Sequence, residues 1–358
     1  MIFYLLLLTL YIWPFGQLLS FTSSALPFNI YLLDIVVSLL FVSLILSKKR
    51  KEIFKTPITK PLLVFTGVVF LSFLFNIKQG IASGLPLSAF YLFRLIIYPS
   101  LFFAARFIDF NRLKKPILIS IGIFLLLGLV QYLGFPDMRF LKPLGFDDHY
   151  FRLIGSLYDP NFTGAILAGL SLYFVGKNKI FTSIPLIGLL ALTFSRASYL
   201  AFGIGLIILF LTRKKIKLIL LVALLGVIVY LIPKPFGEGV NLFRTFSIFS
   251  RVESWQSGLN LFIDKPILGW GYNTLRNAEG GRFQVDNSFI FLLATTGIAG
   301  FFAFINLLIK IFRQAKDKEM LLIITTILIH SLFNNSLFFI WISAVFWFAL
   351  ALSVKLKE

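Results

Sequence analysis

Residues 250–300 read SRVESWQSGLNLFIDKPILGWGYNTLRNAEGGRFQVDNSFIFLLATTGIAG and form the most polar stretch of an otherwise apolar chain. Its first apolar residues recur at spacings of three, four and three, as in an amphipathic helix: Val252, Trp255, Leu259 and Phe262. Ser250 and Glu253 have the spacing of a capping box, so the helix is predicted to begin at Ser250, with Arg251 in its first turn. It is predicted to end at residues 264–266, because the residue before a proline disfavours helical backbone. A helix N-terminus beside an arginine favours anion binding.

The composition indicates a membrane protein. The chain is 58% hydrophobic and 14% charged, with a mean hydropathy of +0.92, values that a soluble globular domain does not need. At ~20 apolar residues per span, the length allows roughly a dozen spans and little room for a separate soluble domain. We therefore expect a single transmembrane domain over residues 1–358. The chain has no cysteine, which excludes disulfides and thiolate chemistry.

Twelve apolar runs predict an all-α polytopic membrane fold with about 12 transmembrane helices. The runs cover about residues 2–20, 28–47, 58–76, 84–105, 116–134, 160–176, 180–195, 197–212, 217–233, 287–312, 320–336 and 337–355. The first run has no basic segment before it and is followed by a second span, so it is predicted to be a span and not a cleaved signal.

The basic residues predict the orientation in the membrane. If both termini are cytoplasmic, the inside loops and the tail hold 21 of the 34 lysine and arginine residues, whereas the much longer outside loops hold ten. This asymmetry is the positive-inside pattern of a cytoplasmic (inner) membrane protein. It explains the net charge of +19 by topology and argues against nucleic-acid binding. The two largest polar segments, 135–158 and 234–286, are then extracytoplasmic, so any chemistry is predicted to face outward.

Short motifs in a set order provide a resemblance to a known family. The main ones are Arg251 with Trp255, Asp-x-Pro-x-x-Gly-x-Gly at residues 264–271, Asn287 followed by an apolar run, and Thr-Gly-x-x-Gly at residues 296–300. Three supporting motifs lie upstream: Arg152-Leu153-Ile154-Gly155, Asp159-Pro160-Asn161 and Ser195-Arg196-Ala197. This order resembles the O-antigen ligase and O-antigen polymerase superfamily, and the resemblance covers about residues 150–312.

The resemblance implies a GT-C-like membrane glycosyltransferase of surface polysaccharide or lipopolysaccharide biosynthesis. Its donor would be a glycan on undecaprenyl pyrophosphate. Its acceptor would be another lipid-linked glycan in a polymerase, or a different acceptor such as lipid A core in a ligase. The ligase branch usually carries a histidine just before the asparagine, where this chain has Asp286. We therefore favour polymerase slightly over ligase.

Four arginines are candidates for binding the donor pyrophosphate. Arg152, Arg196 and Arg251 are predicted at the outer membrane interface, where guanidinium groups would match phosphate oxygens without a metal. For each alone, snorkelling or phospholipid contact is the alternative. Arg94 lies near the middle of a span, where a cation is costly unless it faces a polar cavity or a partner. Its alternative is a buried structural pair with Asp34.

Two residues are candidates for the base that takes the proton of the acceptor hydroxyl. Asp286 is predicted at the membrane surface, and its alternative is that it or Asn287 only caps the following helix. His330 is the only intramembrane histidine, and its alternative is an interhelical hydrogen bond. Glu253 is assigned to the capping box, and His149 is predicted to be a solvated loop residue.

Absent motifs narrow the reaction. The chain has no Asp-x-Asp, Walker or His-Glu-x-x-His motif, so a nucleotide- and metal-independent enzyme without a cofactor is predicted. The alternative from another class is a transporter or flippase of lipid-linked oligosaccharides. Such a transporter often has two related halves with broken helices at corresponding positions, and the large loop at 234–286 has no counterpart in the first half of this chain.

Overall fold

The computed structural model describes residues 1–354 except 23–25, 78–84, 214–218, 234–237 and 278–284. In this part of the chain the protein is an all-α membrane protein with one short antiparallel pair of strands, β1 (Ser20–Phe21) and β2 (Ile30–Tyr31). The helices are α1 (Ile2–Ile12), α2 (Leu32–Ile45), α3 (Arg50–Ile53), α4 (Thr59–Phe75), α5 (Leu85–Ile97), α6 (Ser100–Arg106), α7 (Phe110–Gly134), α8 (Pro160–Gly176), α9 (Ile180–Leu192), α10 (Arg196–Arg213), α11 (Ile219–Leu231), α12 (Phe246–Asp264), α13 (Ser288–Gln314), α14 (Lys318–His330) and α15 (Ile340–Val354).

Each of the twelve predicted apolar runs contains helix in its described part. Five helical segments are long and apolar enough to cross a membrane alone: Ile2–Leu19, Leu85–Arg106, Phe110–Gly134, Arg196–Arg213 and Ser288–Gln314. Helices α2, α4, α9, α11 and α15 are apolar but shorter. In the same bundle, α8 is in contact with α9, α10 and α14. One core cluster lies mainly among α1, α2, α4, α6 and α13–α15, and a second lies among α8–α11.

Two of the predicted runs are broken by proline. In the run 2–20, Pro14 follows Trp13, so α1 gives way to a 3₁₀ helix, Trp13–Leu19, and then to β1. In the run 84–105, Tyr98-Pro99 separates α5 from α6. Proline has no backbone N–H and crowds the preceding turn, which interrupts a helix at these points.

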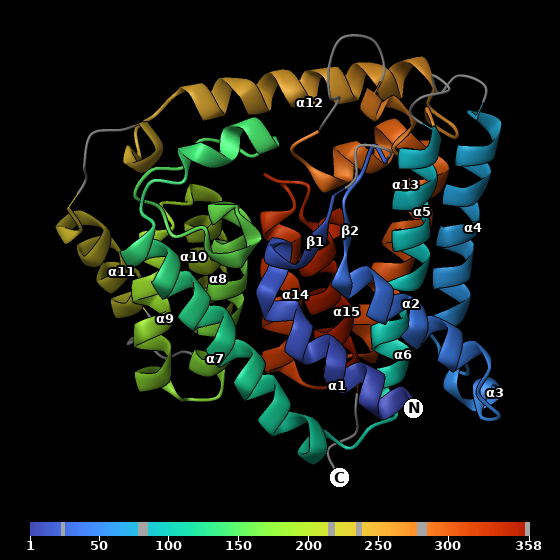
Figure 1. The fold of residues 1–358 in the computed structure, drawn as a ribbon, viewed down its shortest axis with the longest axis horizontal. Coiled ribbons are helices and arrows are strands. Elements are labelled where there is room, and N and C mark those ends of the chain that lie inside the picture. Colours follow the sequence, from blue (N-terminus) through green and yellow to red (C-terminus); the bar gives the residue numbers. More distant parts are fainter. Residues whose placement is uncertain (23–25, 78–84, 214–218, 234–237, 278–284, 355–358) are drawn as a thin grey trace.

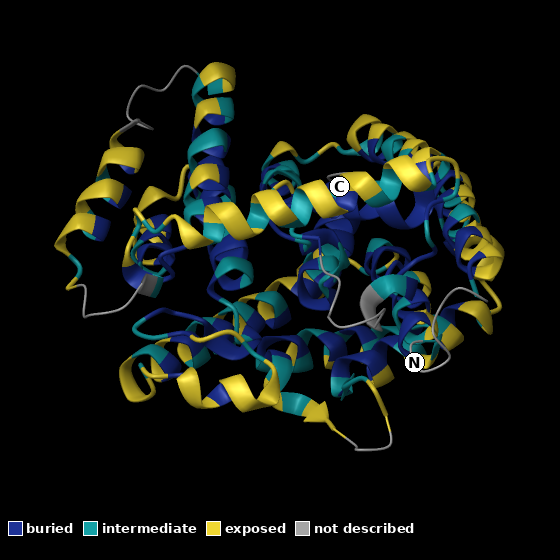
Figure 2. Ribbon diagram, turned by 90° about the horizontal axis from the view of Figure 1, so that it is seen from above, coloured by how far each residue is buried: buried dark blue, intermediate teal, exposed yellow. Residues whose placement is uncertain are grey.

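Helix α12 crosses one face of the bundle, which we call the α12 face (Figure 1). The N-terminus of the chain lies at the opposite end of the bundle. Seen from above, α12 is mainly exposed (Figure 2), and its exposed residues include large apolar ones such as Phe246, Phe249 and Ile263. An exposed apolar side on a helix that lies across the bundle is typical of a helix at a membrane surface.

The predicted start of this helix is wrong by four residues, whereas its predicted end is confirmed. The helix begins at Phe246, with Thr245 at the N-cap position, and ends at Asp264. Ser250 and Glu253 therefore lie inside the helix and form no capping box. The first turn of the helix is held instead by Arg196, whose Nη2 donates to Ser247 Oγ at 2.5 Å.

The segment that follows α12 fits into a break in α13. Trp270 N donates to Ala294 O at 3.0 Å, and on the other side of the break Ile298 N donates to Pro266 O at 2.8 Å. Between them, Gly297 leaves helical geometry, with φ +65° and ψ −168°. The two glycine motifs at 264–271 and 296–300 therefore meet as two backbones in direct contact.

Gly297→Ala is expected to destabilise the protein by about 3 kcal/mol, because a side chain is strained at this positive φ and its Cβ would lie 2.3 Å from Ile267 O. Thermal unfolding of the purified protein in detergent measures this change. Gly67→Ala is the matched control, since a Cβ there meets nothing within 4 Å. Equal melting temperatures for the two variants would contradict the close contact.

Candidate functional site

Arg152 is buried on the α12 face and is held by the turn between α9 and α10. Its Nε donates to Thr193 O at 2.9 Å, and its Nη2 donates to Phe194 O at 3.3 Å. Phe194 has a φ of +49°, as does Phe151 next to Arg152, and Tyr158 in the same loop has a φ of +55°. Bulky residues in this region of φ are strained by roughly 1–3 kcal/mol each, and such strain concentrates at functional sites.

Arg196 and a further arginine, Arg244, connect the chain before α12 to this turn by hydrogen bonds. Arg196 Nη1 donates to Leu242 O at 3.1 Å and to Arg244 O at 3.0 Å. Arg244 Nη2 in turn donates at 3.3 Å to Phe194 O, the carbonyl that also accepts from Arg152. Arg244 belongs to none of the family motifs, so no role was predicted for it. Its position seven residues before Arg251 in the same outer segment was the available signal.

Four arginines, Arg152, Arg196, Arg244 and Arg251, gather at this site, and we call them the arginine cluster. Burial lowers the pKa of Arg152 to about 9, and the nearby charge of Arg244 contributes. Burial also lowers the pKa of Arg251, the charge of Asp286 opposes this decrease, and Arg196 adds to it. Within the described chain, no carboxylate forms an ion pair with Arg152, Arg196 or Arg251. Arginines that are bonded to neutral oxygens and form no ion pair favour the binding of an anion.

Arg251 is linked to His330 through Asn334. Arg251 Nη2 donates to Asn334 Oδ1 at 3.5 Å, and Asn334 Nδ2 lies 3.2 Å from His330 Nε2. Because arginine only donates, the amide oxygen faces Arg251 and the amide nitrogen donates to the imidazole. His330 Nδ1 then donates to Ser336 Oγ at 2.7 Å. The imidazole is fully buried and both nitrogens are bonded. Both partners lie in the segment that directly follows α14, so these bonds are local and do not join two membrane helices.

Asp286 is half-buried beside the same arginine and does not cap the following helix. Asn287 caps α13, because its side chain accepts from Phe289 N at 2.9 Å and from Ile290 N at 3.1 Å. The Asp286 backbone is fixed to α12, since its carbonyl accepts from Trp255 Nε1 at 3.1 Å. Its carboxylate accepts no hydrogen bond from the residues that the structure describes. Burial raises the pKa of this carboxyl, and the charge of Arg251 opposes the increase.

Asp159 is a second acidic group of the site, and no catalytic or binding role was predicted for it. It caps α8 by accepting from Asn161 N at 2.6 Å, and burial raises the pKa of its carboxyl to about 6. Asn161 Oδ1 accepts from Ser195 Oγ at 2.9 Å. The motifs at 159–161 and 195–197 are therefore in direct contact beside the arginine cluster.

His149 is buried, so the prediction of a solvated loop residue is wrong. A bridge between Asp137 and Tyr150 folds its loop back on the bundle, and neither ring nitrogen has a hydrogen-bond partner among the residues that the structure describes. Burial lowers the pKa of His149 to about 3, with a contribution from the charge of Arg152. In the described residues, no group of three or more acidic or histidine side chains could hold a metal ion.

The comparison with known families gives a match in the second half of the chain. Residues 181–305 match the family model of O-antigen ligase. This segment belongs to the O-antigen ligase superfamily. The resemblance predicted from the motifs is thereby confirmed, over a shorter range than the predicted 150–312. No curated protein matches the chain.

The O-antigen ligase segment carries Arg196, Arg244, Arg251 and Asp286, together with the two glycine motifs. Arg152, Asp159 and His330 lie outside the matched residues. The fold adds Arg152 to the segment through the Thr193 and Phe194 carbonyls, and it adds His330 through Asn334. The arginine cluster is therefore assembled from both parts of the chain.

Arg94 is the one predicted arginine with a carboxylate partner in the described chain. It lies on α5 and forms a bidentate pair with Asp34, with Nε 3.0 Å from Oδ1 and Nη2 2.6 Å from Oδ2. Tyr98 donates to Asp34 Oδ1 at 3.0 Å, and Arg94 also donates to Asn29 O at 2.8 Å. The buried structural pair, which the sequence left as an alternative, is present. A phosphate would have to compete with Asp34 for this guanidinium.

Proposed function

We propose that this O-antigen ligase-type membrane protein is a glycosyltransferase that transfers or polymerises glycan from an undecaprenyl-pyrophosphate donor. The reaction would take place on the outer face of the cytoplasmic membrane, in surface polysaccharide biosynthesis. The observation that carries the proposal is the arginine cluster, in which Arg152, Arg196 and Arg251 have no carboxylate partner among the described residues. Guanidinium forks without an internal counterion suit a pyrophosphate.

The proposed topology has about 12 transmembrane helices in a single GT-C-like domain spanning 1–358. Both termini are cytoplasmic and the loop 234–286 is extracytoplasmic, although its residues 234–237 and 278–284 lie outside the described part. The position of the N-terminus away from α12 supports this orientation (Figure 1). Helix α15 ends beside the basic turn between α13 and α14, because Lys316 N donates to Ser353 O at 2.7 Å. This contact supports a cytoplasmic C-terminus.

The proposed reaction is a displacement at the anomeric carbon of the donor. The acceptor hydroxyl oxygen forms the new glycosidic bond while the bond from that carbon to the pyrophosphate oxygen breaks, and the pyrophosphate leaves with the electron pair. Negative charge therefore grows on the leaving group, where preorganised cations stabilise the transition state most. Arg152, Arg196 and Arg251 fill this role, and Arg244 joins them. Arg94 could contribute only by releasing Asp34.

The base in this proposal is Asp286, with His330 as the alternative. The Asp286 carboxylate accepts no hydrogen bond from the described residues, lies beside Arg251 and has a raised pKa, properties that suit a general base. His330 is engaged by Asn334 and Ser336 and would have to break a hydrogen bond to accept a proton. The aspartate in place of the usual histidine favours a polymerase slightly over a ligase.

The test is glycan transfer by the purified protein in liposomes, with an undecaprenyl-pyrophosphate oligosaccharide, EDTA and no nucleotide. We expect longer lipid-linked chains from a polymerase, or transfer to an added lipid A core acceptor from a ligase. Movement of the unchanged oligosaccharide across the bilayer, without a new glycosidic bond, would support the transporter alternative and contradict the proposal.

A further inference from the structure

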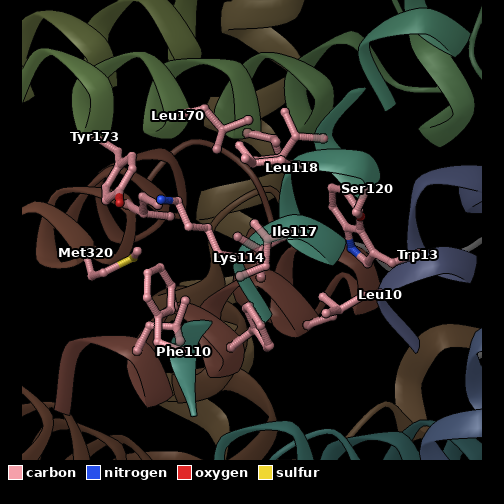
Figure 3. A pocket seen from close by; sticks show the side chains of 18 of the residues that line it. Leu10, Trp13, Phe110, Lys114, Ile117, Leu118, Ser120, Leu170, Tyr173 and Met320 are labelled. Atoms are coloured by element: carbon pink, nitrogen blue, oxygen red, sulfur yellow. The ribbon is translucent and has the colours of Figure 1, made fainter. Parts of the chain in front are cut away.

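An apolar cavity lies on the side of the bundle away from α12. Its volume is about 460 Å³ and it is lined mainly by α1, α7, α8, α14 and α15 (Figure 3). Its walls are almost entirely apolar, with Leu10, Ile117, Leu170 and Phe348 among them. Leu118 on the α7 wall is 52% exposed, so the cavity is open toward the surroundings of the bundle. This volume is in the range of pockets that bind small molecules, and its lining suits a hydrocarbon chain.

Three lysines line the cavity, and they have different partners. Lys177 is neutralised by Asp317, at 3.0 Å, and by Glu319, at 3.1 Å. Lys114 and Lys179 are exposed and have no carboxylate partner within the described residues. Lys114 extends along the cavity toward Tyr173 (Figure 3). The cavity thus combines an apolar interior with two cations that have no internal counterion.

The lysines lie at the end of the bundle opposite α12. Lys114 is in the second turn of α7, which begins at that end (Figure 1). Lys179 directly precedes α9 and follows the last turn of α8. The α8 residues in the cavity are Ile166, Leu170, Tyr173 and Phe174. The arginine cluster lies at the other end of α8, which Asp159 caps. The cavity is therefore distinct from the proposed active site.

We propose that this cavity binds one anionic phospholipid from the leaflet opposite α12, with an acyl chain inside and its phosphate against Lys114 and Lys179. The apolar walls fit the chain, and the two lysines complement a headgroup with net negative charge. Each lysine near a membrane surface contributes roughly a fivefold preference for an anionic lipid. The cavity is short along α8, where it spans only residues 166–174, so it fits an acyl chain better than a much longer polyprenyl chain.

Native mass spectrometry of the full chain tests this proposal. The protein is released from nanodiscs of phosphatidylcholine with one tenth phosphatidylglycerol, and the retained lipid is counted. We expect one retained phosphatidylglycerol per chain. Lys114→Glu with Lys179→Glu should reduce its retention at least tenfold, because both favourable charges become repulsive. Lys115→Glu is the control, since Lys115 is exposed beside Lys114 but does not line the cavity.

Three results would overturn the proposal. Equal retention of phosphatidylcholine and phosphatidylglycerol would remove the role of the lysines. A similar loss in Lys115→Glu would show a general surface attraction in place of a site. Displacement of the retained phospholipid by added undecaprenyl phosphate at equal concentration would assign the cavity to a polyprenyl chain. None of these results depends on glycosyltransferase activity, so the two proposals can fail separately.

Discussion

Arg251→Ala is expected to lower the kcat of glycan transfer by roughly 10²–10³-fold, the loss typical of removing one preorganised group that stabilises transition-state charge. Arg251 is half-buried in α12 and has no ion pair with a described carboxylate. Its charge is therefore available to the leaving pyrophosphate. Steady-state transfer rates at saturating donor measure this effect separately from binding.

Two further variants make this first prediction specific. Arg251→Lys keeps the charge and loses the bidentate fork, so we expect it to recover only part of the rate. Arg139→Ala is the matched control, because Arg139 lies in the outer loop 135–158 but is exposed and paired with Asp137 at 2.6 Å. An Arg251→Ala enzyme as active as Arg139→Ala would exclude Arg251 from the reaction.

Asp286→Asn is expected to lower kcat by roughly 10²–10⁴-fold, the usual contribution of a positioned general base. Asparagine keeps the shape of the side chain and cannot take the proton of the acceptor hydroxyl. The backbone contacts of residue 286 with Ser254 and Trp255 do not involve its side chain, so the fold should be retained. Glu253→Gln is the control, since Glu253 is an exposed carboxylate on α12.

The pH dependence of kcat gives a second measurement of the same role. A base must be deprotonated, so the rate is expected to decline as the pH falls through the pKa of Asp286, which burial raises above its ordinary value. Arg251 opposes this increase in pKa. Arg251→Gln should therefore move the acidic limb of the profile to higher pH, and an unmoved limb would assign the titration to another group.

Much of the fold could be predicted from the sequence because hydropathy and proline act locally. The helix α8 has the predicted bounds of 160–176, since Asp159-Pro160 supplies both the cap and the first helical residue. The end of α12 before Pro266 was predicted for the same kind of reason. The pairing of Asp34 with Arg94 could be anticipated because an unpaired ion inside a span is costly.

The predictions that were wrong or missing concern contacts between distant segments. Ser250 and Glu253 had the spacing of a helix start, but Arg196 fixes the chain at residues 242–247 and the helix begins earlier. His149 is buried because the Asp137–Tyr150 bridge folds its loop inward, which no local pattern indicates. Arg244 was missed for a similar reason, since its bond to Phe194 O depends on how two loops meet.

The central claim is that the arginine cluster holds the donor pyrophosphate, and equilibrium binding of undecaprenyl pyrophosphate to the protein in nanodiscs tests it most directly. The account predicts that replacing Arg152, Arg196 and Arg251 together by glutamine weakens binding at least 100-fold, while Arg139→Gln has no effect. It also predicts that undecaprenol, which lacks the phosphates, binds the wild type and the triple variant equally. Equal affinity of the two proteins for undecaprenyl pyrophosphate would contradict the account.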